Sequence, residues 1–345
     1  MSPHAIVVGG TGQIGRAAVE SLLDHGWAVT AVHRGSTPQP TGWAARGLVE
    51  RRADRADLAS LVREAGGADV LIDTIAYDDA DARQLLDLAG DVGSLIVVSS
   101  ASVYADDDGR TLDAATGPDD FPRFAGPVPE TQATLPPGPA TYSTKKALLE
   151  TTLLDDGRLP VTVLRPGAIH GPGSSSPREV WPLLRALARR PRVPLAYGGE
   201  SRFHTTSAPN LAELIRLAAE RPGSRILNAG DPEPPTVAEI VRAVSASAGH
   251  EPDLVPLDGP APANGVGRTP WSVPRPFVVD MTAATTELGY APVVAYTDAV
   301  AHTSAWLRER LAERPWREAF PLPARYYGDR MDDFAAEDEL LATLP

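Results

Sequence analysis

The chain has 345 residues, of which 43% are hydrophobic and 22% are charged, which is ordinary for a globular protein with one large domain and a smaller one. Its formal net charge of −13 argues against a nucleic-acid partner, because neutralising phosphates requires clustered lysine and arginine. The absence of cysteine excludes disulfides, thiolate zinc sites and a thiol nucleophile.

Neither a membrane partner nor a metal is indicated by the sequence. No apolar stretch reaches the length of a membrane span, and the N-terminus lacks the charged and apolar segments of a secretory signal. The seven histidines show no metal-ligand spacing. We therefore expect a cytoplasmic enzyme without a metal that acts on a small molecule. A homodimer is left open.

A short apolar strand at residues 5–8 leads into three spaced glycines, Gly9, Gly12 and Gly15, and then into a helix pattern. Glycine permits a tight turn, close approach of a pyrophosphate, and close packing of the helix on the strand. The helix directs its free N–H groups at the phosphates. An ordinary glycine-rich turn is the alternative, but this context favours nucleotide binding. Further cofactor contacts are expected from Thr11, Gln13 and Ile14.

The second predicted strand, at residues 28–33, ends next to Arg34. Folds that bind NAD usually place an acid here for the ribose 2′-hydroxyl. No carboxylate occurs between Asp24 and Glu50, and Arg34 stands in that place. Because a guanidinium suits a 2′-phosphate, we expect NADP, with NAD as the alternative. The competing role for Arg34 is that of a solvated surface arginine.

Asp54 and Arg55, which follow the basic pair Arg51-Arg52, are further cofactor candidates. Asp54, near a strand end, is placed to accept the adenine amino group, and its competing role is that of a helix N-cap. Its neighbour Arg55 is expected beside it. Ala76 and Pro166, which follow two later strands, are further candidates. Tyr142 and Lys146 complete the predicted cofactor site, with Lys146 placed to hold a ribose hydroxyl of the nicotinamide half.

Near-continuous apolar strands separated by amphipathic helices predict an α/β fold with a parallel sheet covered on both faces. The elements predicted after Arg55 are helices at 57–64, 81–89 and 141–154 and strands at 69–75, 94–99 and 161–164. Residues 106–139 are rich in Pro, Gly and Asp without a period, which predicts a long loop. This loop is either a functional lid or a tolerated surface insertion.

The C-terminal half has a looser pattern. Its predicted elements are helices at 178–189, 210–219, 236–248 and 297–311 and a strand at 226–229. The helix at 236–248 begins with a capping box, Thr236 to Glu239. Residues 252–276 form a proline-rich connection, and the acidic tail at 329–339 is expected to be a packed surface segment or a subunit contact.

Tyr142 and Lys146 lie four residues apart in a predicted helix, and so on one face of it. The lysine charge is expected to lower the tyrosine pKa towards working pH and to make Tyr142 a general acid or base. A surface pair is the alternative. Ser100 ends a buried strand at the same sheet edge, where its hydroxyl can bind the substrate oxygen that Tyr142 protonates.

Four motifs occur in an order that resembles the extended short-chain dehydrogenase/reductase family, the NAD-dependent epimerase/dehydratase group. They are the glycine motif, Ser-Ser-x-Ser-Val-Tyr at 99–104, Tyr-x-x-x-Lys at 142–146 and Leu-Arg-Pro-Gly-x-x-x-Gly-Pro at 164–172. The resemblance implies a Rossmann doubly wound sheet with a smaller C-terminal α+β substrate lobe. It also implies a catalytic Ser100, Tyr142 and Lys146, with Ser102 as the fallback for Ser100.

The resemblance also sets the expected domain bounds, and one departure from the family's motif bears on the reaction. We expect a dinucleotide-binding domain at 1–170, to which part of 205–230 returns, and a substrate lobe with an acidic tail at 171–345. Family dehydratases carry an acid just after the catalytic hydroxyl residue, where this chain has Ala101-Ser102. Dehydration is therefore not expected.

We predict an NADP-dependent oxidoreductase that moves a hydride between the cofactor and a carbinol or ketone carbon of a sugar-nucleotide-like or natural-product substrate. Epimerisation by transient oxidation is the alternative within enzymes. A non-catalytic dinucleotide-sensing or RNA-associated protein is the alternative outside them. The candidates for substrate binding are Ser102, Arg178, Trp181, Arg202 and His204. A purely structural role is the alternative for each of them.

Overall fold

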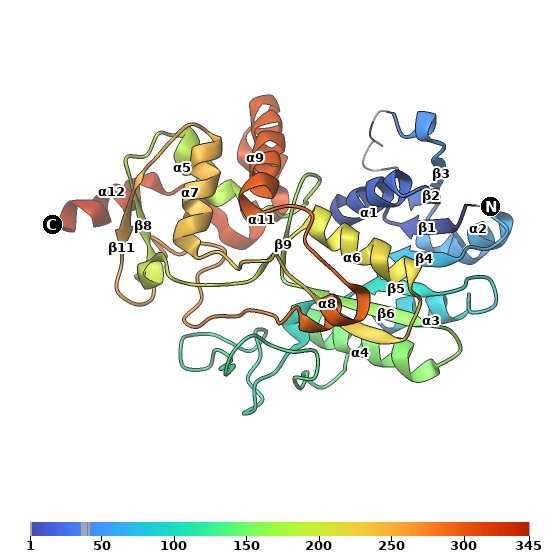
Figure 1. The fold of residues 1–345 in the computed structure, drawn as a ribbon. Coiled ribbons are helices and arrows are strands. Elements are labelled where there is room, and N and C mark those ends of the chain that lie inside the picture. Colours follow the sequence, from blue (N-terminus) through green and yellow to red (C-terminus); the bar gives the residue numbers. More distant parts are fainter. Residues whose placement is uncertain (1, 36–39, 41, 345) are drawn as a thin grey trace.

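A seven-stranded parallel sheet forms the centre of the computed structural model, which describes residues 2–35, 40 and 42–344 (Figure 1). The strand order is β10-β6-β5-β4-β1-β2-β3. The strands are β1 (His4–Val8), β2 (Ala28–His33), β3 (Val49–Arg52), β4 (Val70–Asp73), β5 (Leu95–Val98), β6 (Val161–Pro166) and β10 (Arg225–Ala229). The predicted α/β fold with a Rossmann-type sheet is confirmed.

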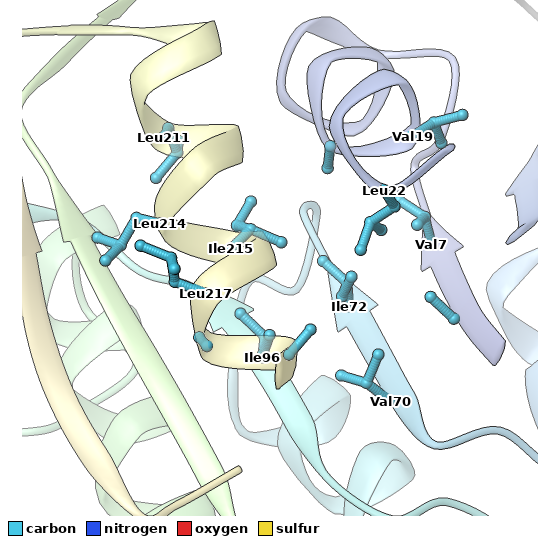
Figure 2. Packing of buried hydrophobic residues seen from close by; sticks show 14 of the residues in the cluster. Val7, Val19, Leu22, Val70, Ile72, Ile96, Leu211, Leu214, Ile215 and Leu217 are labelled. Atoms are coloured by element: carbon cyan, nitrogen blue, oxygen red, sulfur yellow. The ribbon is translucent and has the colours of Figure 1, made fainter. Parts of the chain in front are cut away.

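Helices cover both faces of this sheet because successive strand residues point to opposite sides. On one face Ile72 packs with α1 (Gln13–Asp24), α6 (Ala208–Glu220) and α8 (Thr282–Leu288) (Figure 2). On the other face Leu71 packs with α2 (Leu58–Glu64), α3 (Asp79–Leu86) and α4 (Tyr142–Asp156). The two apolar layers fix the sheet edge on which the candidate site stands.

The strand order reverses at β1, which has β2 on one side and β4 on the other. The register places Val8 level with Val32 of β2 and Asp73 of β4. The loops that leave these three strands therefore open at one edge. In open α/β sheets the crevice outside the carboxyl ends of the strands, at such a switch point, is where ligands bind.

A second lobe follows the sheet and holds its own apolar core, with Trp181, Trp271 and Met331 buried in it. Its helices are α5 (Val180–Leu187), α7 (Val237–Ser247), α9 (Tyr296–Glu313), α10 (Trp316–Ala319), α11 (Pro321–Tyr327) and α12 (Phe334–Thr343). Its strands pair as β8 (Arg192–Leu195) with β11 (Asp253–Pro256), and as β7 (Ala168–His170) with β9 (Thr205–Ser207). The division at residue 170 stays a prediction.

The sequence pattern predicted the long elements well and missed short ones. The strand at 28–33 has the predicted bounds, and the capping box of Thr236 and Glu239 is formed. One expectation needs correction, because the proline-rich connection at 252–276 contains β11. β3 ends shortly before Asp54, which was expected near a strand end, and the acidic tail overlaps α12. The tail packs into the second lobe, where Glu337 and Leu341 are buried.

Residues 106–139 form an anchored loop with isolated bridges. Glu130 accepts the backbone N–H of Asn228 at 2.8 Å, and Val128 bridges to Val279. The Asp106 carboxylate accepts the backbone N–H groups of Arg110 and Arg123, both at 2.8 Å. The first two contacts hold the loop against β10 and the segment before α8, and the Asp106 bonds fold the loop on itself.

Candidate active site

The glycine loop after β1 is shaped by backbone contacts that leave no room for a side chain. Gly9 has a φ of +80°, which disfavours other residues. A Cβ on Gly15 would lie 2.2 Å from the carbonyl oxygen of Gly9, so helix α1 packs directly on the loop. Gly12 is the N-cap of α1 and has no side chain to cap it. The first N–H groups of α1 are thus suited to a bound anion.

A cavity of about 390 Å³ opens beside this loop. It joins the glycine loop, the end of β2, the segment after β3 and Ile75. Six predicted cofactor residues line it together: Gly9, Thr11, Gly12, Arg34, Asp54 and Arg55. Asp54 has both of its expected positions, because it lines the cavity and also caps a short 3₁₀ helix by accepting the N–H of Ala56 at 3.3 Å. The cavity and loop thus form a nucleotide-binding crevice beside the N-terminus of α1.

Two guanidiniums stand at the outer end of β2 and β3. Arg34 is exposed, and Arg52 donates its Nε–H to the Arg34 carbonyl oxygen at 3.1 Å. His33 lies 2.7 Å from Glu50 and accepts the N–H of Gly35 at 3.0 Å. Arg34 and Arg52 therefore place two guanidiniums beside the end of β2.

Arg55 has protein partners that the sequence did not predict. Its guanidinium lies 2.6 Å from Asp73, which is fully buried at the end of β4, and 2.6 Å from Asp81 at the start of α3. Asp73 also accepts the N–H groups of Ile75 and Ala76. Arg55 thus neutralises a buried carboxylate as well as lining the cavity.

The remaining cofactor candidates lie along the same edge. Gln13 donates to the Gly171 carbonyl oxygen at 3.3 Å and so ties α1 to the loop after β7. Ile14 packs into the core beneath α1. Ala76 follows β4, and Pro166 ends β6.

Lys146 is buried beneath this edge. Its ammonium donates to the carbonyl oxygen of Ala76, which follows β4, at 2.6 Å and to that of Val98, the last residue of β5, at 2.9 Å. Burial lowers the pKa of Lys146 to about 8, against the opposing charge of Asp73. An ammonium has three donors, so one remains for a further acceptor.

Tyr142, the first residue of α4, stands over Lys146, whose Nζ is 5.8 Å from the centroid of the phenol ring. Burial raises the pKa of Tyr142 above its ordinary value of 10.0, although 46% of the residue is exposed; the neighbouring Ser100 hydroxyl lowers the pKa by less. The expected lowering of this pKa is thus not seen, because burial outweighs the stabilisation of the phenolate. Tyr142 is held as a neutral phenol.

The serines next to Tyr142 form a connected row. Ser100 donates to Ser102 at 2.9 Å, and Ser143 lies 2.8 Å from Ser102. Ser143 also donates to Asp113, on the 106–139 loop, at 2.7 Å. The sequence predicted Ser100 and Ser102 but missed Ser143 and Asp113. Ser143 sits inside the Tyr-x-x-x-Lys motif, and Asp113 lies in an aperiodic stretch.

A second cavity of about 540 Å³ lies between the 106–139 loop and the second lobe. Its walls come from residues 112–121, 260–274 and 326–331. They are mostly proline, alanine and aromatic side chains, with the guanidiniums of Arg268 and Arg330 among them. An apolar body with an anionic end would suit this lining.

The predicted substrate residues separate into two groups. Trp181 lines the second cavity, and Arg178 is partly buried near enough to Tyr142 for its charge to lower the phenol pKa. Arg202 instead donates to the Pro234 carbonyl oxygen. His204 is buried, with one ring nitrogen 2.8 Å from the Asp231 carbonyl oxygen and the other accepting the N–H of Val279. For Arg202 and His204 these contacts favour the structural alternative.

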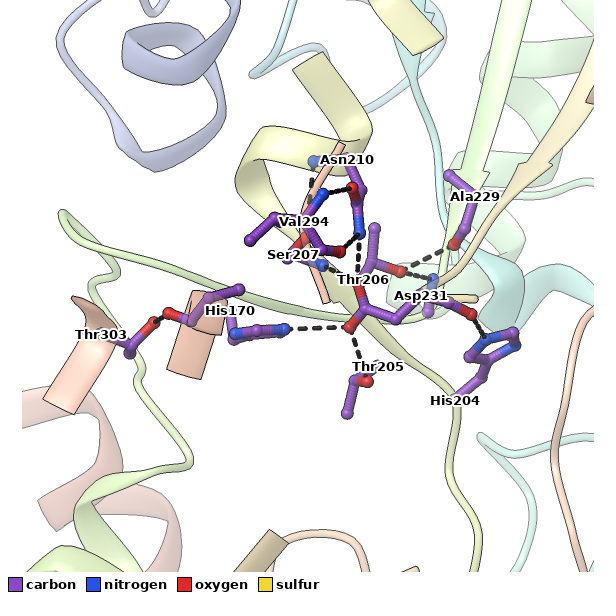
Figure 3. Close-up of polar contacts among 12 residues, drawn as sticks. His170, His204, Thr205, Thr206, Ser207, Asn210, Ala229, Asp231, Val294 and Thr303 are labelled. Atoms are coloured by element: carbon purple, nitrogen blue, oxygen red, sulfur yellow. Dashed lines mark hydrogen bonds and ion pairs between the residues drawn. The ribbon is translucent and has the colours of Figure 1, made fainter. Parts of the chain in front are cut away.

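A buried polar cluster joins the two lobes behind the candidate site (Figure 3). Asp231 accepts from Ser207, Asn210 and Thr205 and lies 3.0 Å from His170. Burial alone would raise the pKa of Asp231, but His170 and the other donors hold it well below its usual range. The cluster fixes β7, β9 and α6 against one another.

Two further findings concern the described residues alone. Between residues 2 and 344, gaps excepted, no helix has both the length and the apolarity needed to cross a membrane. In the same part of the chain no group of three His, Asp or Glu side chains is arranged to hold a metal ion.

Comparisons with known proteins agree with this architecture. The model of the NAD dependent epimerase/dehydratase family matches residues 5–230. The 2-alkyl-3-oxoalkanoate reductase of Stenotrophomonas maltophilia is 28% identical over 259 residues, which cover 71% of this chain and 75% of the relative.

Solved structures share the fold at low sequence identity. MoeE5 in complex with UDP-glucose and NAD has a TM-score of 0.63 and 23% identity, over 89% of this chain and 99% of that one. The UDP-N-acetylglucosamine 4-epimerase of Methanobrevibacter ruminantium, in complex with UDP-N-acetylmuramic acid, has a TM-score of 0.68 and 17% identity, over 90% and 99%.

Proposed function

The chain belongs to the NAD dependent epimerase/dehydratase family, as its motifs predicted, and is an enzyme of the NAD-dependent oxidoreductase or epimerase type; we propose that its net reaction is the NADPH-dependent reduction of a ketone. In this proposal Tyr142 gives the proton, Ser100 orients the substrate oxygen and Lys146 supports both. The observation that carries it is the convergence of these three side chains at the sheet edge that also holds the cavity beside the glycine loop.

The protonation state of Tyr142 favours reduction over oxidation. A reductase needs an acid to protonate the oxygen as the hydride arrives, whereas an alcohol dehydrogenase needs a base. Because burial raises the pKa of Tyr142, the neutral phenol is the resting form near neutral pH. NADPH, when bound, supplies the hydride. The protein supplies the proton and holds the oxygen.

Lys146 has the geometry to serve the cofactor and the phenol together. Two of its donors are taken by the carbonyl oxygens of Ala76 and Val98. We propose that the third binds a ribose hydroxyl of the nicotinamide half. The charge beneath the ring of Tyr142 then stabilises the phenolate left after proton transfer.

NADP is the proposed cofactor because of the positive charge at the end of β2. Arg34 lines the dinucleotide cavity, and Arg52 is bonded to the Arg34 backbone beside it. A 2′-phosphate carries up to two negative charges and suits a guanidinium, whereas the neutral 2′-hydroxyl of NAD leaves that charge unused. Arg34 thus replaces the acid that binds the hydroxyl in NAD enzymes.

For the substrate we propose a 3-oxo acid with an apolar body, the class named for the S. maltophilia relative. The cavity of about 540 Å³ offers proline, alanine and aromatic side chains for such a body. Arg178 is electrostatically coupled to Tyr142, and so lies near the carbonyl that Tyr142 would protonate. In a 3-oxo acid the carboxylate is two carbons from that carbonyl, within reach of a neighbouring guanidinium.

The test is reduction of a 2-alkyl-3-oxoalkanoate by NADPH, followed as oxidation of the cofactor. Tyr142→Phe should lower kcat by about 100-fold or more, the range for a lost general acid, with the affinity for NADPH unchanged. Tyr77→Phe is the matched control, because its ring lies 5.9 Å from that of Tyr142. Equal rates for the unmodified enzyme and Tyr142→Phe would refute the proposed role.

A further inference from the structure

We propose that Ser102, Ser143 and Asp113 form a proton relay that returns a proton from solvent to Tyr142 after each turnover. The inference rests on the proposed function and deepens it, because only a reaction that consumes a proton needs such a relay. None of these three residues has to touch the reacting atoms, so each acts through Tyr142 and Ser100.

The row of oxygens is continuous and short. Ser100 Oγ is 2.9 Å from Ser102 Oγ, Ser102 Oγ is 2.8 Å from Ser143 Oγ, and Ser143 Oγ is 2.7 Å from Asp113 Oδ1. At the inner end the Ser100 hydroxyl lies close enough to the phenol of Tyr142 to lower its pKa. Ser143 is fully buried in the middle, and Asp113 is exposed at the outer end. The row therefore runs from the candidate reaction centre to solvent.

Each hydroxyl in the row can pass one proton, because it has one O–H donor and two lone pairs. In the resting row Ser100 donates to Ser102, and Ser143 donates to Asp113. After Tyr142 has protonated the substrate oxygen, the hydroxyls turn their O–H groups towards Tyr142, so that Ser100 gives its proton to the phenolate, Ser102 to Ser100 and Ser143 to Ser102. A proton taken from water by Asp113 restores Ser143. The net change is one ketone, one NADPH and one proton consumed, and one alcohol and one NADP⁺ formed.

An epimerase would have no use for this path. It returns to the substrate the proton that it first removed, so Tyr142 ends each cycle as it began. A reductase leaves a phenolate after every turnover, while cofactor and product still cover the phenol. The relay thus distinguishes net reduction from epimerisation within the same fold.

Asp113 also has a structural role that the test has to separate. Its Oδ2 accepts the Thr141 hydroxyl and the backbone N–H of Ser143, and so caps the start of α4. Asparagine in its place keeps an acceptor for these donors but cannot carry a proton. The Asp113→Asn variant therefore preserves most of the cap and breaks the relay.

The experiment measures kcat and KM for NADPH reduction of a 2-alkyl-3-oxoalkanoate, with and without imidazole as a diffusible proton carrier. Asp113→Asn and Ser143→Ala should each lower kcat at least about tenfold while KM stays constant. Imidazole should restore kcat in both variants and leave the unmodified enzyme unchanged. Asp113→Glu should keep most of the rate, as should Asp119→Asn, an exposed carboxylate on the same loop.

Three results would overturn the relay. The first is an unchanged kcat in Asp113→Asn and Ser143→Ala. The second is a lower kcat that imidazole does not restore, which would leave Asp113 as a helix cap alone. The third is an unmodified enzyme that turns over no 3-oxo acid, which would refute the proposed function and the relay together; the first two leave that function standing.

Discussion

Replacing Asp231 by asparagine should destabilise the protein strongly, because the carboxylate is fully buried at the junction of the two lobes (Figure 3). One oxygen accepts the backbone N–H of Ser207 at 2.8 Å and the amide of Asn210 at 3.0 Å. The other accepts the Thr205 hydroxyl at 2.7 Å and faces His170 at 3.0 Å. An asparagine at 231 has one acceptor for these two pairs of donors.

The size of the loss in the free energy of unfolding depends on which pair of hydrogen bonds the asparagine cannot make. Asn210 is fixed by its bonds to residues 293–294, so the new amide nitrogen has to turn towards Thr205 and His170. Two hydrogen bonds to a charged group are then lost, at roughly 1.5–3 kcal/mol each. The expected decrease in the free energy of unfolding is about 3–5 kcal/mol, the range for breaking a buried ion pair.

The decrease in the free energy of unfolding should depend on pH, and the protonation of His170 determines in which direction it changes. Burial alone would lower the pKa of His170, but the hydrogen bond and charge of Asp231, helped by Glu179, raise it above 6.5. The contribution of the charged histidine is therefore complete below pH 6.5 and is lost as the pH rises through the raised value. Asparagine removes it, so the difference between variant and unmodified protein is largest in mild acid.

Urea unfolding at several pH values measures both effects. Asp253→Asn, on the exposed side of β11, is the matched control and should change the free energy by less than about 0.5 kcal/mol. A loss below about 1 kcal/mol for Asp231→Asn would refute the reasoning, since it is less than one charged hydrogen bond. A loss that does not change with pH would refute the role given to His170.

The cofactor site gives two further predictions. Arg34→Glu should weaken NADP binding by about 10- to 100-fold, the value of one charge-assisted hydrogen bond, and leave NAD binding the same or tighter. Fluorescence titration checks this, with Arg51→Glu as control; tighter NAD than NADP binding by the unmodified protein would contradict the cofactor proposal. Gly15→Ala should displace the loop, because its Cβ would lie 2.2 Å from a backbone oxygen, and so lower both stability and cofactor affinity. A Cβ on Gly12 would lie 3.2 Å from the same oxygen, a tight but milder contact, so Gly12→Ala should weaken cofactor binding and lower the melting temperature less than Gly15→Ala does. Equal melting temperatures for both variants would refute this distinction.

The sequence was most informative where one local pattern determined the structure. Strands such as residues 95–98 are apolar on both faces, and the glycine loop needs its residues at fixed spacings. By contrast, β3 has the sequence Val-Glu-Arg-Arg, and all four residues are exposed at the sheet edge. It pairs through its backbone, which the side-chain pattern does not reveal.

The parts of the site that the sequence could not predict depend on distant contacts. Asp113 reaches Ser143 across 30 residues from a loop without periodicity. Arg55 was expected at the cofactor, and its pairing with Asp73 depends on how β4 ends beside the segment after β3. The pKa of Tyr142 depends on burial by residues from both lobes, which the spacing to Lys146 does not contain.

The central claim is that this enzyme transfers a hydride to a ketone and then releases the oxidised cofactor. NADPH with deuterium at the transferable position of the nicotinamide, incubated with a 2-alkyl-3-oxoalkanoate, tests it directly. We predict deuterium on the carbinol carbon of the product and one free NADP⁺ for each alcohol formed. Label that stays with a bound cofactor, while the substrate changes only its configuration, would contradict the claim.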